Sequence, residues 1–254
     1  MDKTSIGDRM KQYEAVPKLF LMRKNPVIIR LDGKAFHSFT KGFDKPFDEH
    51  FMSCMKATMM ELCKEVQGCV LGYTQSDEIT LVLCDYQKID TDAWFGYNLQ
   101  KIVSISASIA TLTFHRHLEF LYDYTAWGDG NSKEALLREK LKKDALFDSR
   151  AFSLPLHEVA NCLIWRQQDA TRNSIQSLAQ SLYPHKELQG LNTKQLQDKM
   201  FTEKGVNWND LPTEQKRGSC CIKTEMGWQI DYEIPIFTQN RNYVESRLIF
   251  EDSK

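Results

Sequence analysis

Two short apolar runs that lie far apart in the chain each meet acidic residues at one end. Residues 26–31 read Pro-Val-Ile-Ile-Arg-Leu, which predicts a buried strand, and this strand leads directly into Asp32. A second apolar, β-branched run, Ile-Thr-Leu-Val-Leu-Cys, follows Asp77 and Glu78. Because acidic residues are depleted within strands, any fold of this chain has to accommodate carboxylates beside two buried strands.

These acids support two interpretations. Asp32 followed by Gly33 is a common turn sequence, and Ser76-Asp77 suits a hairpin bend at the surface. Alternatively, the two strand ends lie side by side and pair their carboxylates. Such a pair can hold two divalent metal ions roughly 3.5–4 Å apart, which clamp the attacking and leaving oxygens of a phosphoryl transfer. The dipeptides alone leave both interpretations open.

The order of the predicted elements indicates the fold class. We predict helices at residues 5–15, 48–66 and 93–121, and strands at residues 26–31, 69–75, 78–84 and 151–154. In chain order these elements are helix, strand, helix, strand, strand, helix and strand. After the first short helix, this order is typical of an α+β, ferredoxin-like (βαββαβ) fold. That fold places the end of the first strand beside the hairpin between the next two, so Asp32 and Asp77 are expected to meet.

Beyond residue 154 the pattern changes. Helices are predicted at residues 156–183 and 193–205, and a closing pair of strands is predicted at residues 219–224 and 228–236. We therefore expect a catalytic domain at residues 1–154, with additional C-terminal helices and a small strand pair at residues 155–254 that pack on it or continue it. Residues 123–150 indicate a loop, including residues 128–131, followed by a solvated basic helix.

Charge and cysteine content exclude some classes of protein. The 254 residues carry a formal net charge of −1 with a sequence pI near 6.6, which argues against a nucleic-acid coating protein but not against an enzyme with a local basic patch. The seven cysteines contain no Cys-x-x-Cys pair, so we expect reduced thiols and no structural zinc site. Without a signal peptide or a membrane-length apolar stretch, the chain is expected to be cytoplasmic.

Several segments together resemble the tRNA-His guanylyltransferase family. The strongest are residues 30–40 (RLDGKAFHSFT), 43–48 (FDKPFD) and 73–78 (YTQSDE). The resemblance continues, in the family's order and over most of the chain, at residues 101–104 (KIVS), 165–167 (WRQ), 207–209 (NWN) and 216–218 (KRG). Members of this family are 3′-to-5′ nucleotide polymerases, so the resemblance implies a nucleotidyltransferase built on a polymerase-type palm.

The resemblance also implies roles for particular residues. In the family, the aspartates that match Asp32 and Asp77 and the backbone carbonyl that matches Gly33 hold two Mg²⁺ ions, in agreement with the preference of Mg²⁺ for carboxylate and phosphate oxygens. Asp32, Asp77 and Glu78 are then the catalytic acids, and Glu78 supports the metal ligands from behind. The implied contacts to GTP, ATP or another nucleoside triphosphate are Asp32, Gly33, Lys34, Ala35, Phe36, His37, Lys45, Ser76, Asp77, Lys101 and Ser104.

Two departures from the family pattern bear on the substrate. Phe47 stands where eukaryotic members carry Asn, and residues 171–174 (TRNS) stand where they carry His-Ile-Asn-Asn, so only Asn173 of that run matches. The chain is therefore more similar to bacterial and archaeal members, which restore missing 5′ nucleotides of truncated tRNA and use the opposite strand as template. The resemblance implies tRNA with an incomplete 5′ end as the partner, and a homotetramer as the assembly.

Other functions stay open beside this repair activity. The first is guanylyl addition to the 5′ end of the histidine tRNA. The second is a nucleotide cyclase, which also uses a palm with two metal-binding aspartates but forms a cyclic product without RNA. The third is a non-catalytic RNA-binding module, whose RNA binding would survive the loss of Asp77. This third function is disfavoured, because two unneutralised carboxylates would repel a phosphate backbone.

Overall fold

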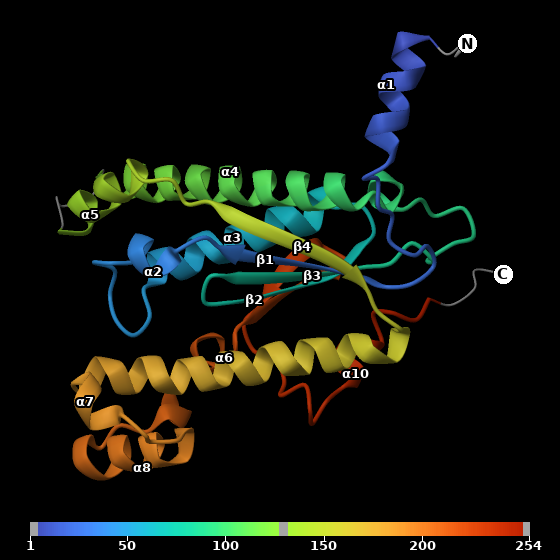
Figure 1. The fold of residues 1–254 in the computed structure, drawn as a ribbon. Helices are drawn as coiled ribbons and strands as arrows, with labels where there is room; N and C mark the ends of the chain where they lie inside the picture. Colours follow the sequence, from blue (N-terminus) through green and yellow to red (C-terminus); the bar gives the residue numbers. More distant parts are fainter. Residues whose placement is uncertain (1–4, 127–131, 251–254) are drawn as a thin grey trace.

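The computed structural model describes residues 5–126 and 132–250, and its centre is one antiparallel sheet (Figure 1). The strand order is β4-β1-β3-β2-β5-β6, and each neighbouring pair is antiparallel. The strands are β1 (Val27–Gly33), β2 (Cys69–Gln75), β3 (Glu78–Leu83), β4 (Phe147–Ser153), β5 (Ser219–Thr224) and β6 (Gly227–Asp231).

Helices cover both faces of this sheet because its central strands are apolar on both sides. Figure 1 shows α4 (Leu99–Ala126) on one side and α6 (Val159–Leu182) on the other. Alternate residues of β1 divide between the two cores: Ile29 packs in the core that includes α3 (Glu49–Glu65) and α4, whereas Ile28 packs in the core that includes α6. This period-2 alternation decides which side chains of β1, β3 and β4 face α6.

Local signals explain where α3 begins and how closely it packs. Asp48 caps the helix, since its Oδ1 accepts a hydrogen bond from the backbone N–H of Phe51 at 3.0 Å. Gly72 on β2 allows α3 to approach the sheet, because a Cβ atom there would lie 2.5 Å from Sγ of Cys63. The helix and the strand therefore fix each other's position, and with it the hairpin between β2 and β3.

The remaining helices lie around this central unit. They are α1 (Ile6–Ala15), α2 (Phe36–Phe39), α5 (Ser132–Leu141), α7 (His185–Leu188), α8 (Thr193–Lys204), α9 (Thr213–Arg217) and α10 (Asn242–Glu245). Helix α1 extends away from the body (Figure 1), and every one of its residues is exposed. Helix α8 begins with a capping box between Asn192 and Gln195 and packs with the C-terminal half of α6 in a separate small core.

The structure confirms the α+β class and the predicted order of elements through β4, and it corrects three details. β4 begins at Phe147, not at residue 151, because the polar residues Asp148, Ser149 and Arg150, which precede the apolar run, also pair with β1. The helix within residues 123–150 is not simply solvated, since Lys140 of α5 is fully buried; the predicted loop at residues 128–131 lies outside the described residues. The second closing strand, β6, ends at Asp231 and not at residue 236, and its partner β5 joins the main sheet beside β2.

The sheet therefore continues across the predicted domain boundary at residue 154. Strands β5 and β6 extend the sheet that β1 to β4 begin, and α6 covers a face formed by β1 to β3. All seven cysteines are free thiols. Within the described residues, no helix is both long and apolar enough to cross a membrane.

Candidate functional site

Three carboxylates form a row across the sheet on the face covered by α6. Asp32 on β1 is the register partner of Glu78 on β3 and of Asp148 on β4. Directly opposed residues of an antiparallel pair point to the same face, and this face is the one whose Ile28 packs with α6. We call Asp148, Asp32 and Glu78 the acidic row.

Asp77 joins this row from the turn between β2 and β3. The backbone N–H of Gly33 donates to the carbonyl oxygen of Asp77 at 3.0 Å, which ties the end of β1 to the hairpin. Burial raises the pKa of Asp77, and the nearby charge of Asp32 raises it further. The two strand ends, more than forty residues apart in the chain, therefore place Asp32 and Asp77 within electrostatic reach of each other.

Arginines neutralise both ends of the acidic row. At one end, Nη2 of Arg150 donates to Oδ1 of Asp148 at 2.7 Å. At the other end, Nε of Arg166 on α6 donates to Oε1 of Glu78, also at 2.7 Å, and both side chains are buried. Asp32 and Asp77 form no ion pair with the described residues, so the negative charge of the site is least compensated between them.

Arg30 lies behind Asp32, two residues earlier on the same face of β1. Its Nε is 4.0 Å from Oε2 of Glu78, too far for a hydrogen bond. This buried Nε has no hydrogen-bond partner among residues 5–126 and 132–250. A buried donor without a partner is rare in folded proteins, so the site retains capacity to bind an anionic group beside the acids.

Burial raises the pKa of each acid at the centre of the site. For Asp32, burial is the main cause and the charge of Asp148 adds to it, while Arg150 and Arg30 oppose the shift. For Glu78, burial again raises the pKa although Arg166 favours the charged form. Carboxylates whose ionised form is disfavoured in the folded protein gain most from a cation, so the electrostatics suit a metal site.

The donor set fits Mg²⁺ better than a metal bound by protein alone. The described residues contain no cluster of three or more His, Cys, Asp and Glu residues that could hold an ion. Mg²⁺ is commonly bound through one or two carboxylates plus substrate phosphate oxygens. The uncompensated pair Asp32 and Asp77 matches that requirement.

The peptide at Gly33 is held in place by a cluster of phenylalanine rings. A Cβ atom at residue 33 would lie 2.4 Å from Cγ of Phe36, so only glycine fits beneath this ring. Phe36 in turn packs on Phe147 and Phe39, with ring centroids 5.0 and 5.3 Å away. The neighbouring residue Ala35 has a φ of 55°, in the left-handed region that non-glycine residues rarely adopt.

The structure narrows the set of backbone amides that could bind phosphate. The amide of Gly33 already donates to Asp77, and that of Lys34 donates to the carbonyl oxygen of Leu146 at 2.8 Å. This leaves the amides of residues 35–37 as candidates. The side chain of Phe36 is buried, so it contributes only its backbone, whereas His37 is exposed and its charge lowers the pKa of Asp77.

A cavity of about 260 Å³ lies beside the hairpin that carries Asp77. The loop between α2 and α3, the hairpin, α6 and α9 supply its walls. Of the residues named from the sequence, it is lined by Lys45, Ser76, Phe47 and Asn173. Phe47 and the second half of the departing run, Asn173 and Ser174, therefore line this cavity, whereas Thr171 and Arg172 line a different hollow.

Lys101 and Ser104 do not reach this site within the chain. Both lie on α4, which packs on the opposite face of the sheet from the acidic row. Oγ of Ser104 donates to the carbonyl oxygen of Gln100 at 2.7 Å, and Nζ of Lys101 lies 5.8 Å from the ring centroid of Phe95. Helical spacing correctly places the two side chains on one face of a helix, but that face is not the one beside the acids.

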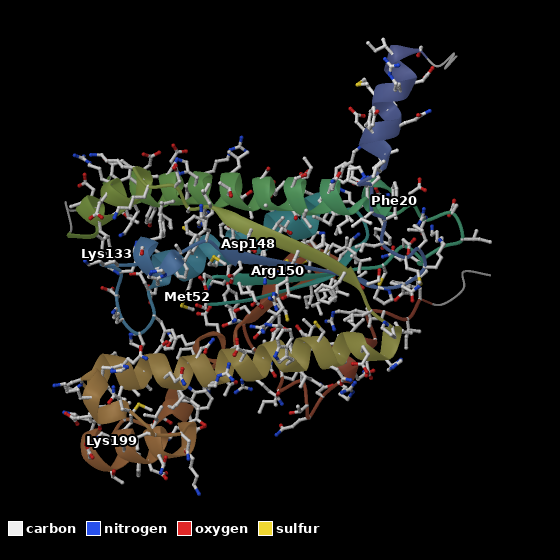
Figure 2. All side chains as sticks on the ribbon, in the orientation of Figure 1. Phe20, Met52, Lys133, Asp148, Arg150 and Lys199 are labelled. Carbon is white, nitrogen blue, oxygen red and sulfur yellow. The ribbon has the colours of Figure 1, made fainter. Side chains whose placement is uncertain are left out.

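Sequence reasoning missed Asp148 and Arg150 at the site. Figure 2 labels both on β4, the edge strand, between α4 and α6. The run Phe147-Asp148-Ser149-Arg150 contains a single apolar residue and so offers little of the strand pattern. It was too short and too polar to distinguish from the end of a solvated helix.

Comparisons with known proteins agree on one family. A family model described as tRNAHis guanylyltransferase matches residues 7–155. Among curated proteins, the chain is 31% identical to an uncharacterized protein of Acanthamoeba polyphaga mimivirus, over 98% of this chain and 87% of the viral protein.

Solved structures show the same similarity over nearly the whole chain. A bacterial tRNA(His) guanylyltransferase (Thg1)-like protein in complex with ATP has a TM-score of 0.86 and 45% identity, covering 96% of this chain and 99% of the other. A bacterial protein of the same description in complex with GTP has a TM-score of 0.77 and 40% identity, covering 97% and 100%.

Proposed function

The chain belongs to the tRNA(His) guanylyltransferase family of nucleotidyltransferases, and we propose that it repairs truncated tRNA by template-dependent 3′-to-5′ nucleotide addition. In this reaction the 3′-hydroxyl of an incoming nucleotide attacks an activated 5′ end of the RNA. The observation that carries the proposal is the pair Asp32 and Asp77, which lies beside a cavity lined by Lys45 and Ser76 and forms no ion pair within the described part of the chain.

We interpret the first part of the sheet as a polymerase-type palm. The strand order β4-β1-β3-β2, with α3 and α4 on one face, matches the ferredoxin-like arrangement. Residues 1–154 then form the catalytic unit, and residues 155–254 complete it by adding α6 over the acidic row and β5 and β6 to the sheet.

Asp32, Asp77 and the carbonyl group of Gly33 are the proposed ligands of two Mg²⁺ ions. When bound, these ions lower the pKa of the attacking hydroxyl and stabilise charge on the transferred phosphoryl group. Glu78 is oriented by Arg166 and keeps the acidic row in register behind Asp32. Its position fits a supporting role better than direct binding, since Arg166 already occupies one of its carboxylate oxygens.

The triphosphate of the incoming nucleotide is proposed to lie between the backbone at residues 35–37 and the cavity. There, Lys45 and Ser76 line the cavity, and Oγ of Ser76 donates to Oδ1 of Asp77 at 3.1 Å. Phosphoryl transfer depends mainly on such positioning and on charge stabilisation. The solved complexes of the bacterial relatives with ATP and GTP support nucleoside triphosphates as substrates.

We further propose that the chain acts as a homotetramer in the cytoplasm. Helix α1 supports association, because Ile6, Met10 and Tyr13 lie on one face of the helix and are all exposed. An apolar stripe of this kind on a projecting helix is typical of a segment that packs against another subunit.

Guanylyl addition to the histidine tRNA is the second candidate. The description of the matching family model favours it. The sequence disfavours it, since Phe47 and the run at residues 171–174 depart from the pattern of the eukaryotic enzymes.

One experiment separates these functions. A tRNA that lacks its first nucleotide and carries a 5′-triphosphate is incubated with Mg²⁺ and each nucleoside triphosphate singly, with all four bases in turn at the opposing position. Repair predicts addition only of the complementary nucleotide. Addition of G whatever the opposing base would favour the second candidate, and a cyclic product formed without RNA would identify a cyclase.

A further inference from the structure

Trp165 on α6 is the most exposed aromatic side chain that contacts the arginines of the acidic site. Its exposed fraction is 52%, whereas Arg166 and Gln167, which follow it in the helix, are 6% and 5% exposed. A single exposed apolar side chain needs no explanation by itself. Trp165, however, is held in a defined position beside the acidic row, and this position does need an explanation.

Two guanidinium groups fix the indole ring. Cζ of Arg30 lies 5.4 Å from the ring centroid, and Cζ of Arg166 lies 4.3 Å from it. Arg166 is anchored by Glu78 and by Asp169, each at 2.7 Å. Because the protein's own side chains supply these contacts, the ring is preorganised at little further entropic cost.

The ring also lines a hollow distinct from the cavity that contains Lys45. This second hollow, of about 250 Å³, is lined by Trp165, Gln168, Asp169 and Arg172, among others. The Lys45 cavity uses a different face of α6, formed by Ala170, Asn173, Ser174 and Ser177. The two hollows are therefore separate, and Trp165 connects the second one to Arg30 and so to Asp32.

The surroundings of Trp165 carry exposed cationic groups. Arg172 on the rim of its hollow has a side chain 60% exposed, and Arg150 at the open edge of the sheet is 48% exposed (Figure 2). Exposed arginines near a fixed aromatic ring are the combination with which proteins hold an unpaired nucleotide, through base stacking and phosphate contacts.

We propose that Trp165 is a stacking platform for a nucleobase at the end of the RNA substrate. This inference rests on the proposed function, in which the triphosphate of the incoming nucleotide takes the Lys45 side of the site. The RNA end then approaches from the other hollow, and the ring supports a terminal base while Arg172 and Arg150 lie near its phosphates. Trp165 is a substrate-positioning residue in this account and takes no part in the chemistry.

The test combines a protein change with an RNA change. Trp165→Ala and Trp165→Phe are compared with Tyr124→Ala, a matched control on α4 whose side chain is 75% exposed on the other side of the sheet. RNA affinity is measured by fluorescence anisotropy with a hairpin that has a recessed 5′ end, and again with hairpins in which the terminal nucleotide of either strand is abasic. The KM values for RNA and for nucleoside triphosphate are measured in parallel.

We expect Trp165→Ala to weaken RNA binding by about 5- to 100-fold, the range for loss of one base–aromatic stack. Trp165→Phe recovers most of this loss, and Tyr124→Ala has no effect. One of the two abasic hairpins should bind the unchanged protein as weakly as the intact hairpin binds Trp165→Ala. When the protein change and the RNA change are combined, the loss of RNA affinity should be no greater than with either change alone. A merely structural role of Trp165 would not produce this non-additivity.

Three results would overturn the proposal. One is unchanged RNA affinity in Trp165→Ala, and another is independent, multiplicative losses from the two changes. The third is a rise confined to the KM for nucleoside triphosphate, which would assign the ring to the incoming nucleotide. If the unchanged protein adds no nucleotide but shows the non-additive pattern, the repair function fails while the stacking platform stands.

Discussion

Nε of Arg166 on α6 donates a 2.7 Å hydrogen bond to Oε1 of Glu78 on β3, and the two side chains are only 7% and 9% exposed. This contact joins the helix that begins the second half of the chain to the acidic row of the first half. The second half of the chain therefore holds one end of the row in place.

Removal of one partner of this pair should destabilise the fold strongly. We expect Arg166→Met to lower the free energy of unfolding by about 3–5 kcal/mol, because Glu78 would keep a buried, unpaired carboxylate. The double variant Glu78→Gln/Arg166→Met should recover much of the loss. Urea unfolding measures both values. Arg172→Met is the matched control, since the Arg172 side chain is 60% exposed and its ion pair with Asp169 should contribute less than about 1 kcal/mol.

Asp77→Asn should separate activity from stability. We expect nucleotide addition to fall by about 10³-fold or more, since metal-assisted charge stabilisation contributes several kcal/mol to phosphoryl transfer. Without Mg²⁺ at neutral pH, the same variant should be more stable than the unchanged protein, by about 0.5–2 kcal/mol, because it removes repulsion from Asp32. A variant that keeps its activity, or that unfolds more easily, would contradict the proposed role.

The stability gain of Asp77→Asn should depend on pH in a defined direction. The pKa of Asp77 is raised in the folded protein by burial and by Asp32, so ionisation of this carboxyl costs stability. That cost is fully present above the folded-state pKa and disappears as the pH falls below the ordinary aspartate value of 3.8. Thermal unfolding of both proteins, followed from neutral pH down to about 4, should show the difference shrinking.

Mg²⁺ should stabilise the unchanged protein only where both carboxyls are ionised. Because burial raises the pKa of Asp32 and of Asp77, the affinity for Mg²⁺ should decline at a higher pH than it would for unperturbed aspartates. Calorimetric titration at several pH values measures this, with Asp77→Asn as the control that binds weakly throughout. Equal affinity in the two proteins would show that the ion binds elsewhere.

The accuracy of sequence reasoning depended on whether a signal was local. The ends of β1 and β3 were predictable because apolar runs stop at Asp32 and begin after Glu78, and the cap at Asp48 because it precedes a helical pattern. Asp148 was not predictable, since its position opposite Asp32 depends on a strand register formed more than a hundred residues later. The position of Lys101 on the opposite face from the acids was also not predictable, because spacing along a helix does not say which side of a sheet the helix covers.

Lys140 shows the same limit for a charged core residue. Nothing in the sequence distinguishes Lys140 from Lys142 in the basic run at the end of α5. Yet Lys140 is fully buried, and its Nζ donates to the carbonyl oxygen of Lys41 at 2.6 Å. Nζ of Lys133 on the same helix lies 2.7 Å from Oδ2 of Asp44. Helix α5 therefore holds the loop that contains Lys45 at two points.

Loss of the buried contact should loosen this loop and weaken nucleotide binding. We expect Lys140→Met to raise the KM for nucleoside triphosphate by about tenfold, the equivalent of one hydrogen bond of about 1.4 kcal/mol, with a smaller change in the KM for RNA. Lys142→Met, at an exposed position of the same run, is the control and should change neither. If Lys140→Met alters only thermal stability, α5 does not position the cavity.

The exposed face of α1 gives the last prediction, which concerns assembly. Ile6, Met10 and Tyr13 are 73%, 47% and 67% exposed, and α1 contributes no buried residue to its own chain. Replacing all three with Ser should therefore shift the mass measured by light scattering from tetramer to smaller species while leaving the monomer's fold intact. Changing Arg9 and Lys11, exposed polar residues of the same helix, to Ser should leave the mass unchanged. A tetramer that survives the triple change would place the subunit interface elsewhere, and a monomeric unchanged protein would refute the tetramer itself.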